Sequence, residues 1–202
     1  MHSIPNKDNF SDAYADKAPW DIPRAQPAFV EAADRVAGQV LDSGCGTGEN
    51  ALFFAERGHA VTAIDFLEEP IVRARPKADE RGLKVDFRVH DALALEALGE
   101  TFDTAIDCGL FHVFADEDRW RYVAGLTQVV RPGGMLLLEC FSDQEPGEAG
   151  PRRISQADLR EAFAAGWTIE SITPTQFQVI PEYADTFTPG GPKAWFVVAR
   201  RT

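Results

Sequence analysis

Short apolar runs alternate with amphipathic segments along most of the chain. The runs are rich in β-branched and aliphatic residues, and the segments between them repeat apolar positions at helical spacing, so strands are predicted to alternate with helices. The predicted parallel strands are 39–42, 60–65, 84–91, 102–107 and 135–141. The predicted helices are 50–58, 68–82, 116–130 and 155–166.

Turn and capping residues set the ends of these elements. Ser155, with Asp158 three residues later, has the pattern of a helix N-cap, and Gly166 is a helix stop signal. Residues 131–134 (RPGG) are expected to form a turn before the fifth strand. Pro76 stands inside a helical pattern and is expected to kink or shorten that helix.

The alternation also predicts how the strands connect. Parallel strands joined by helices need right-handed crossovers, which place helices on both faces of the sheet. Runs 167–179 and 193–201 have no helix between them and are expected to pair antiparallel at one edge. The expected fold class is α/β, with one Rossmann-like three-layer domain over residues 31–202. Residues 1–30, rich in proline and aromatic residues, are expected to form an irregular lid.

Composition narrows the choice of partner. The chain has 202 residues, of which 45% are hydrophobic, enough for one substantial core. Its formal net charge of -12 repels phosphate backbones and anionic lipids, so nucleic acid and membrane surfaces are disfavoured as partners. We expect a small-molecule partner, and a chain that works as a monomer or homodimer.

The cysteines point to a reducing compartment. Cys45, Cys108 and Cys140 are scattered, with no CxxC pair and no zinc-binding spacing, so no metal site is expected. The opening MHSIPNKDNFSDAYADKAPW has no apolar core flanked by basic residues, and a signal peptide is therefore not expected. The protein is expected to be cytoplasmic.

Acidic residues stand at or beside the carboxyl ends of all five predicted parallel strands. In an open parallel sheet these ends meet along one edge, where ligands bind. Each acid alone has a structural explanation as an N-cap or loop residue, but their gathering on one edge favours a ligand with positive charge or many hydroxyl donors. The residues are Asp42, Asp65, Asp91, Asp107 and Glu139.

The first strand runs into a glycine-rich loop, VLDSGCGTGENA. A dinucleotide site needs GxGxxG, but here Gly44, Gly46 and Gly48 alternate and Glu49 stands in place of the last glycine. No GK[ST] follows, so a phosphate-binding P-loop is also excluded. S-adenosylmethionine, which carries a sulfonium, an ammonium and a ribose but no phosphate, fits the acids better. A nicotinamide-dependent oxidoreductase stays open as an alternative.

The same motifs, taken in order, resemble those of class I S-adenosylmethionine-dependent methyltransferases. They are VLDSGCGTGENA, AID at 63–65, HDAL at 90–93, FDTAIDCGLFHVF at 102–114 and RPGGMLLLE at 131–139. The resemblance implies a seven-stranded, mostly parallel sheet with the last strand inserted antiparallel. The N-terminal YADKAPWDIPRAQP is similar to the entry segment of small-molecule methyltransferases of the thiopurine, tellurite-resistance and bacterial heteroaromatic kinds.

The resemblance also implies a role for each motif residue toward the cofactor. Asp42 and the Gly44–Gly46–Gly48 loop would lie against the methionine part. Cys45 stands in this cofactor-binding loop and is expected to fill space there; the alternative is a nucleophile, but no histidine is adjacent in sequence. Asp65 would accept hydrogen bonds from the ribose hydroxyls, and Asp91 from the adenine amino group. The remaining implied contacts are the Ala92 backbone N–H with the adenine ring, Phe66 and Leu93 on its faces, and Asp107 and Cys108 along the cofactor.

Other residues are candidates for the acceptor side of the site. His112 follows the fourth strand and is the candidate general base; the alternative is that it packs against the cofactor or caps a helix. Tyr14 and Trp20 are expected either in the core or in the lid, facing the sulfonium. The long segment 141–155 is expected to build the acceptor pocket. In it, Arg152 and Arg153 either steer an anionic acceptor or are solvated.

These observations predict an enzyme. It would transfer a methyl group from S-adenosylmethionine to an O, N or S atom of a small aromatic acceptor, with S-adenosylhomocysteine as product. Phe111, Phe114 and Phe141, expected near the edge of the site, motivate the aromatic acceptor. A positioned acceptor that is already ionised needs no base. A non-catalytic S-adenosylmethionine-binding regulatory protein stays open as a second alternative.

Overall fold

Seven strands form one sheet in the computed structural model, which describes residues 7–15 and 18–202. The strand order is β3-β2-β1-β4-β5-β7-β6. Strands β1 to β5 are parallel, and β7 pairs antiparallel with both β5 and β6. The predicted α/β fold, with its late antiparallel strand, is therefore confirmed. The strands are β1 (Gln39–Ser43), β2 (Ala60–Asp65), β3 (Val85–Val89), β4 (Phe102–Cys108), β5 (Val130–Phe141), β6 (Trp167–Gln176) and β7 (Lys193–Arg201).

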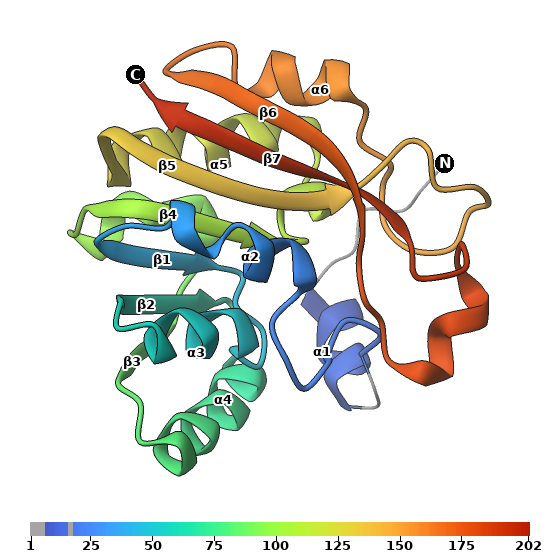
Figure 1. Ribbon diagram of the computed structural model, residues 1–202, viewed down its shortest axis with the longest axis horizontal. Coiled ribbons are helices and arrows are strands. Elements are labelled where there is room, and N and C mark those ends of the chain that lie inside the picture. The colour runs from blue at the N-terminus through green and yellow to red at the C-terminus, as the bar shows by residue number, and fades with distance from the viewer. Residues whose placement is uncertain (1–6, 16–17) are drawn as a thin grey trace.

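Helices cover both faces of the sheet (Figure 1). The helices α2, α3 and α4 pack on one face, and η2, α5 and α6 pack on the other. The α-helices are α1 (Lys7–Ala15), α2 (Pro27–Glu31), α3 (Glu49–Glu56), α4 (Glu68–Arg81), α5 (Asp116–Val129) and α6 (Gln156–Ala162). The short 3-10 helices are η1 (Ala33–Arg35), η2 (Ala92–Leu98), η3 (Phe111–Val113) and η4 (Pro181–Thr186).

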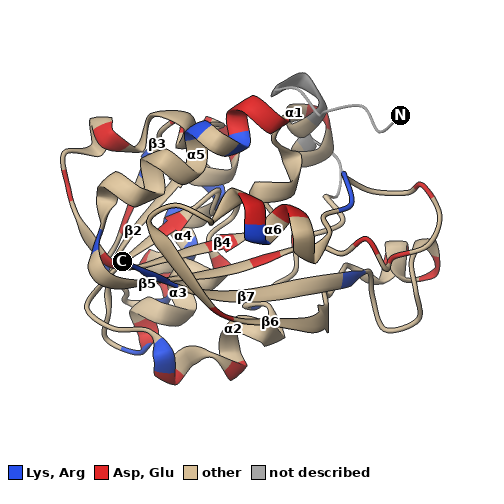
Figure 2. Cartoon of the chain, turned by 90° about the horizontal axis from the view of Figure 1, so that it is seen from above, with Lys and Arg blue, Asp and Glu red and all other residues tan. Residues whose placement is uncertain are grey.

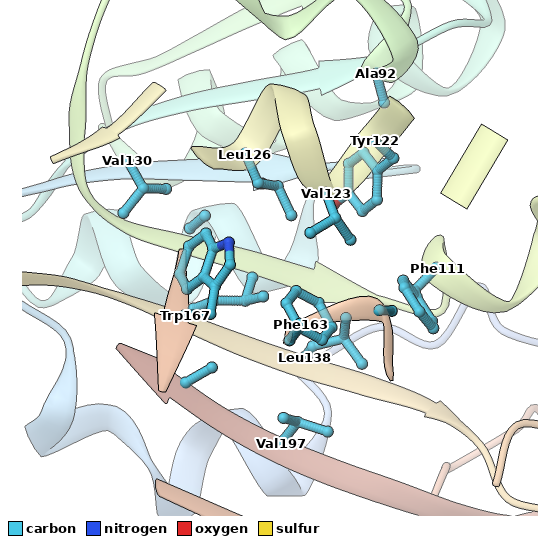
Figure 3. Packing of buried hydrophobic residues seen from close by; sticks show 14 of the residues in the cluster. Ala92, Phe111, Tyr122, Val123, Leu126, Val130, Leu138, Phe163, Trp167 and Val197 are labelled. Atoms are coloured by element: carbon cyan, nitrogen blue, oxygen red, sulfur yellow. The ribbon is translucent and has the colours of Figure 1, made fainter. Parts of the chain in front are cut away.

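Alternation along the central strands fills two separate cores. Leu136 and Leu138 of β5 face α5 and α6, whereas Leu137 faces the α3 side. In the first core, aromatic and aliphatic side chains from helices and strands pack together around Phe163 and Trp167 (Figure 3). Burying the central strands on both faces explains why their sequences read as continuous apolar runs.

The N-terminal segment and the fifth strand differ from the sequence predictions. Residues 7–15 form the helix α1 rather than an irregular segment, because Phe10, Ala13 and Tyr14 follow helical spacing and pack together on one side. The predicted turn at 131–134 is wrong, since β5 already begins at Val130 and absorbs this stretch as an irregularity in its pairing with β4. The lid prediction for residues 1–6, 16 and 17 lies outside the described residues.

Helix α4 is not shortened by its internal proline and continues to Arg81. Proline removes the hydrogen bond to the carbonyl four residues earlier, which belongs to Val72. Both Pro76 and Val72 are exposed, so water can satisfy that carbonyl. Helix α6 begins at the predicted cap, with reciprocal hydrogen bonds between Ser155 and Asp158, but ends at Ala162, before Gly166.

Acidic and basic positions are interspersed over the helices (Figure 2). Many form surface ion pairs, such as Arg88 with Asp86 and Glu100. Within the part of the chain that the structure describes, no helix has the length and hydropathy needed to span a membrane.

Candidate functional site

A cavity of about 980 Å³ opens at the carboxyl ends of the parallel strands. Its walls come from the glycine loop, the residues after β2, β3 and β4, the N-terminal segment, and the stretches 141–151 and 177–187. The arrowheads of β1, β4 and β5 point toward this region and α1 (Figure 1). All the predicted site residues except Asp42 and Asp107 line it: Tyr14, Trp20, Gly44, Cys45, Gly46, Gly48, Asp65, Phe66, Asp91, Ala92, Leu93, Cys108 and His112.

The glycine loop has the tight geometry that its sequence predicts. Gly46 and Gly48 have φ of 53° and 87°, a region that side chains rarely adopt. A Cβ on Gly46 would lie 2.7 Å from the Tyr14 hydroxyl, and one on Gly48 would lie 2.8 Å from the Phe87 ring. Glycine at these two positions therefore leaves room for the Tyr14 hydroxyl at Gly46 and for the Phe87 ring at Gly48.

Asp65, at the end of β2, ties this loop to the sheet. Its Oδ2 accepts a hydrogen bond from the Gly46 backbone N–H at 3.0 Å, and its Oδ1 accepts one from the Leu67 N–H at 3.0 Å. Burial raises the pKa of Asp65, and these bonds oppose the rise. The carboxylate thus borders the cavity in a fixed orientation and keeps lone pairs for a ligand hydroxyl.

The adenine side of the predicted site is formed by the chain after β3. Asp91 caps the 3-10 helix η2, with Oδ1 accepting from the Leu93 backbone N–H at 2.9 Å. Leu93 and Phe66 both line the cavity, and the adenine sandwich between them stays a prediction. The motif HDAL therefore forms a helix start, although the sequence analysis had placed no helix there.

Three of the acids lie behind the cavity wall and not in it. Asp42, Asp107 and Glu139 are fully or almost fully buried. Neither oxygen of Asp42 or Glu139 has a hydrogen-bond partner in the described chain, whereas Asp107 Oδ1 accepts from the Leu110 and Phe111 N–H groups. Burial raises the pKa of Asp42 to about 8, with Asp107 adding to the rise, and burial raises that of Asp107 to about 7.

Glu49, the acid that replaces the last glycine, is paired with cations from α4. Its Oε1 lies 2.9 Å from the Lys77 Nζ and its Oε2 lies 2.8 Å from the Arg81 guanidinium. Lys77 also donates to the Thr47 hydroxyl at 2.8 Å. Lys77 and Arg81 thus balance the negative charge of Glu49, and these contacts fix the glycine loop to α4.

The aromatic residues of the N-terminal segment form a cap over the glycine loop. Trp20 Nε1 donates to the Tyr14 hydroxyl at 3.1 Å, and the two rings meet edge to face at 5.9 Å. Asp21 anchors the cap, because it accepts from the Thr47 hydroxyl at 2.5 Å and pairs with Arg73 at 2.6 Å. Tyr14 is buried and Trp20 is half-exposed, and both line the cavity.

A second contact, which the sequence analysis missed, joins this cap to the chain after β6. The buried Gln26 side chain donates to the Gln178 carbonyl at 2.9 Å and accepts from the Gln178 N–H at 2.8 Å. The Ile180 N–H donates to the Pro19 carbonyl at 2.9 Å. We call residues 18–26 and 177–180 the roof. These partners are about 150 residues apart in sequence, so no local pattern predicts the roof.

Replacing Gln26 with alanine should destabilise the protein by about 1–2 kcal/mol, because two backbone groups of Gln178 lose their buried partner. Urea unfolding measures this change. Arg24→Ala is the matched control, since Arg24 donates to the Gln178 side chain at 2.8 Å on the exposed side of the roof. We expect it to cost less than about 0.5 kcal/mol. Equal effects of the two substitutions would contradict the role given to Gln26.

The cavity continues beyond the glycine loop into an apolar part lined by aromatic rings. Phe141 and Phe177 stack at 5.6 Å, and Phe187 meets Phe141 edge to face at 5.8 Å. Phe114 and Phe141 line the cavity as expected. Phe111 does not, because its fully buried ring stacks on Phe163 in the core. The prediction for Phe111 is therefore wrong, since a loop position does not show which way a side chain turns.

The two arginines of the 141–155 segment are held by other groups. Arg152 pairs with Asp116 at 2.7 Å. Arg153 lies over the Phe141 ring at 5.1 Å and donates to backbone carbonyls of its own loop, among them Ala149 and Pro151. Neither cation lines the cavity. Their role is to shape the loop, and steering of an anion by them is not supported.

His112 lies in η3 at the junction between the two parts of the cavity. It is buried, and its Nδ1 accepts a hydrogen bond from the Phe141 backbone N–H at 3.1 Å. The rings of Phe141 and Phe177 meet it edge to face. The described residues hold no cluster of acids, histidines and cysteines that could bind a metal ion.

Comparison with known proteins shows the family. Residues 40–134 match the family described as "Methyltransferase domain". The chain is 34% identical over 182 residues to 2-heptyl-1-hydroxyquinolin-4(1H)-one methyltransferase of Mycobacteroides abscessus, covering 88% of this chain and 79% of that protein. This chain is thus similar in sequence to methyltransferases, and the alternative of a nicotinamide-dependent oxidoreductase is not supported.

Solved structures agree. One, described as "Conversion of a Disulfide Bond into a Thioacetal Group during Echinomycin Biosynthesis", is 38% identical with a TM-score of 0.80, over 91% of this chain and 84% of that one. Another is 1,6-didemethyltoxoflavin-N1-methyltransferase of Burkholderia thailandensis with bound S-adenosylhomocysteine. It is 26% identical with a TM-score of 0.73, over 96% of this chain and 86% of that one. The chain therefore belongs to the class I S-adenosylmethionine-dependent methyltransferases.

Proposed function

We propose that this methyltransferase modifies an O, N or S atom of a small, planar aromatic or heterocyclic acceptor. The observation that carries the proposal is the apolar part of the cavity, where Phe141, Phe177 and Phe187 form an aromatic wall next to the cofactor side. Planar rings pack well against such walls. Two relatives support the same class, because their names give a hydroxyquinolinone and a didemethyltoxoflavin as acceptors.

The residues present fit S-adenosylmethionine. The cavity brings together a glycine loop that admits close approach, an oriented carboxylate at Asp65 and the pair Phe66 and Leu93 for a flat base. Asp42 contributes a buried carboxyl with both oxygens unpartnered behind the loop. The cofactor supplies a methyl group on a positively charged sulfonium. The proposed contacts of Asp65 and Asp91 with it are those implied by the family resemblance. Asp42 and Asp107 lie behind the cavity wall, so the lining does not support a direct contact of either with the cofactor.

The chain's own contribution to transfer is positioning and exclusion of water. The roof and the aromatic cap line the cavity on one side, and the loop that Arg153 organises contributes Gly150 and Pro151 to its wall. An acceptor held flat between aromatic rings can be aimed at the methyl group, which lowers the entropic part of the barrier. Removing water also strengthens the attraction between an anionic acceptor and a cationic donor.

Two measurements test the proposal. Isothermal titration should show binding of S-adenosylhomocysteine and no binding of NAD. Hydroxylated and sulfhydryl heteroaromatics, incubated with S-adenosylmethionine, should then yield S-adenosylhomocysteine, with 2-heptyl-1-hydroxyquinolin-4(1H)-one as the first probe. Turnover of aliphatic but not aromatic acceptors would overturn the proposed acceptor class. Cofactor binding without turnover of any acceptor would favour the regulatory alternative.

We also propose that the enzyme works in the cytoplasm, as a monomer or homodimer. The three cysteines, Cys45, Cys108 and Cys140, are free thiols in the structure, which suits a reducing compartment.

A further inference from the structure

The two ring nitrogens of His112 have different surroundings. Nδ1 accepts a hydrogen bond from the backbone N–H of Phe141 at 3.1 Å. A backbone N–H can only donate, so the neutral ring must carry its proton on Nε2. Among the residues that the structure places, the hydrogen bond of this ring is the one through Nδ1, and the side chain lines the cavity. His112 therefore offers the cavity a donor and not a lone pair.

The surroundings also keep this ring neutral. Phe141 and Phe177 cover it at ring distances of 5.3 and 6.1 Å. Burial, together with the nearby positive charge of Arg153, lowers the pKa of His112 to about 3. Glu145 is the acid beside Arg153, but its carboxylate is engaged by the backbone N–H groups of Thr188 and Lys193. An imidazolium has no counter-ion of its own at this place.

We infer that His112 is a hydrogen-bond donor to the methyl acceptor, and that the acceptor binds as an aromatic anion whose charge lies partly on an oxygen facing Nε2. This inference rests on the proposed function and narrows its acceptor class. It also differs from the role expected from the sequence, in which His112 is a general base that accepts a proton from the acceptor. A general base would need a free lone pair on Nε2, the nitrogen proposed to face the acceptor. Because the Phe141 N–H occupies the lone pair of Nδ1, the ring proton sits on Nε2 and that lone pair is absent.

The reaction balances without a base. The ionised acceptor supplies the electron pair for its new bond to the methyl carbon, and the methyl–sulfur bond breaks with its pair left on sulfur. The negative and positive charges cancel, and no proton is lost. Donation from Nε2 stabilises the anionic form of the acceptor more than the neutral form, so His112 would select acceptors that are ionised near neutral pH.

The first test needs no acceptor. A two-bond 15N–1H spectrum of protein labelled on histidine nitrogens reports which ring nitrogen is protonated, and His112→Gln identifies the His112 signals. We expect a neutral ring with its proton on Nε2 from pH 5 to 9. A His112 ring that titrates in this range, or that carries its proton on Nδ1, overturns the inference, whether or not a substrate has been found.

The second test compares His112→Gln with His112→Ala. Glutamine keeps an N–H donor but cannot act as a base. With 2-heptyl-1-hydroxyquinolin-4(1H)-one as probe, His112→Ala should lower kcat/KM by roughly 10- to 100-fold, as expected for a lost hydrogen bond to a charged group. His112→Gln should recover most of this loss. In wild type and His112→Gln alike, the rate should rise with pH only as the probe ionises.

Two outcomes would contradict the donor role. One is a His112→Gln variant as slow as His112→Ala, and the other is an additional rise of the wild-type rate with pH that the glutamine variant lacks. Titration with S-adenosylhomocysteine serves as the control, since its affinity should be the same in all three proteins. A wild-type protein that binds no S-adenosylhomocysteine would count against the proposed function. The NMR measurement of the His112 tautomer does not depend on that result and tests the donor role separately.

Discussion

Asp65→Ala is expected to weaken S-adenosylhomocysteine binding by about 5- to 150-fold, which corresponds to about 1–3 kcal/mol. The substitution removes the proposed acceptor for the ribose hydroxyls. It also frees the Gly46 and Leu67 backbone N–H groups, which Asp65 now binds at 3.0 Å each. The loss should therefore lie toward the upper end of the range. Isothermal titration of the purified variant measures it.

Glu49→Gln is the matched control for this result. Glu49 also lines the cavity and also loses a carboxylate, but its charge is already balanced by Lys77 and Arg81. We expect a smaller change in cofactor affinity than for Asp65→Ala. An Asp65→Ala protein that binds S-adenosylhomocysteine as well as wild type would remove Asp65 from the cofactor site.

The cofactor-free protein is expected to lose stability as the pH rises from about 5 to 8.5. Burial raises the pKa of Asp42 to about 8 and that of Asp107 to about 7, from an ordinary value of 3.8. Between these values the folded protein holds protons that the unfolded chain has released, so the free energy of unfolding falls with rising pH. His112, whose pKa is lowered from 6.5 to about 3, opposes part of this fall up to about pH 7, because there the unfolded imidazole holds a proton that the folded ring does not, but it is one group against two carboxyls. Acids with lowered pKa, such as Asp158, change stability only at lower pH.

Thermal melting across this pH window checks the prediction. Each kcal/mol lost should lower Tm by roughly 2–4 °C in a domain of this size, so we expect a fall of several degrees. Asp42→Asn replaces the carboxyl by a neutral group of the same shape, and its Tm should depend less on pH. A wild-type Tm that stays constant or rises between pH 5 and 8.5 would show that these buried acids are ionised in the folded protein.

The sequence predicted features that depend on neighbouring residues. Periodicity located the strands, and the left-handed conformations of Gly46 and Gly48 follow from residue type. Asp65 and Asp91 could be placed at the site because Asp65 ends, and Asp91 closely follows, a strand that the apolar pattern identifies. The order of the motifs along the chain then favoured one cofactor over the alternatives.

Contacts between distant segments were not predictable in this way. Gln26 meets Gln178 across 152 positions, and no periodicity connects the two. The role of His112 depends on the Phe141 N–H, which lies 29 residues further along the chain. The direction of the Asp42 side chain could not be predicted from the sequence either. Its place at the end of β1 was predicted, but only packing decides that its carboxyl lies behind the cavity and not in it.

The position of β7 has a consequence for biosynthesis. This strand comes last of the seven along the chain, yet it lies between β5 and β6 and pairs with both. Until residues 193–201 leave the ribosome, the nascent chain carries a long apolar strand, β5, with one edge open to other unpaired strands. Trp195 and Val197 then complete the core. Emergence of the final strand, and not assembly of the cofactor-binding half, should therefore end the period in which the new chain can aggregate.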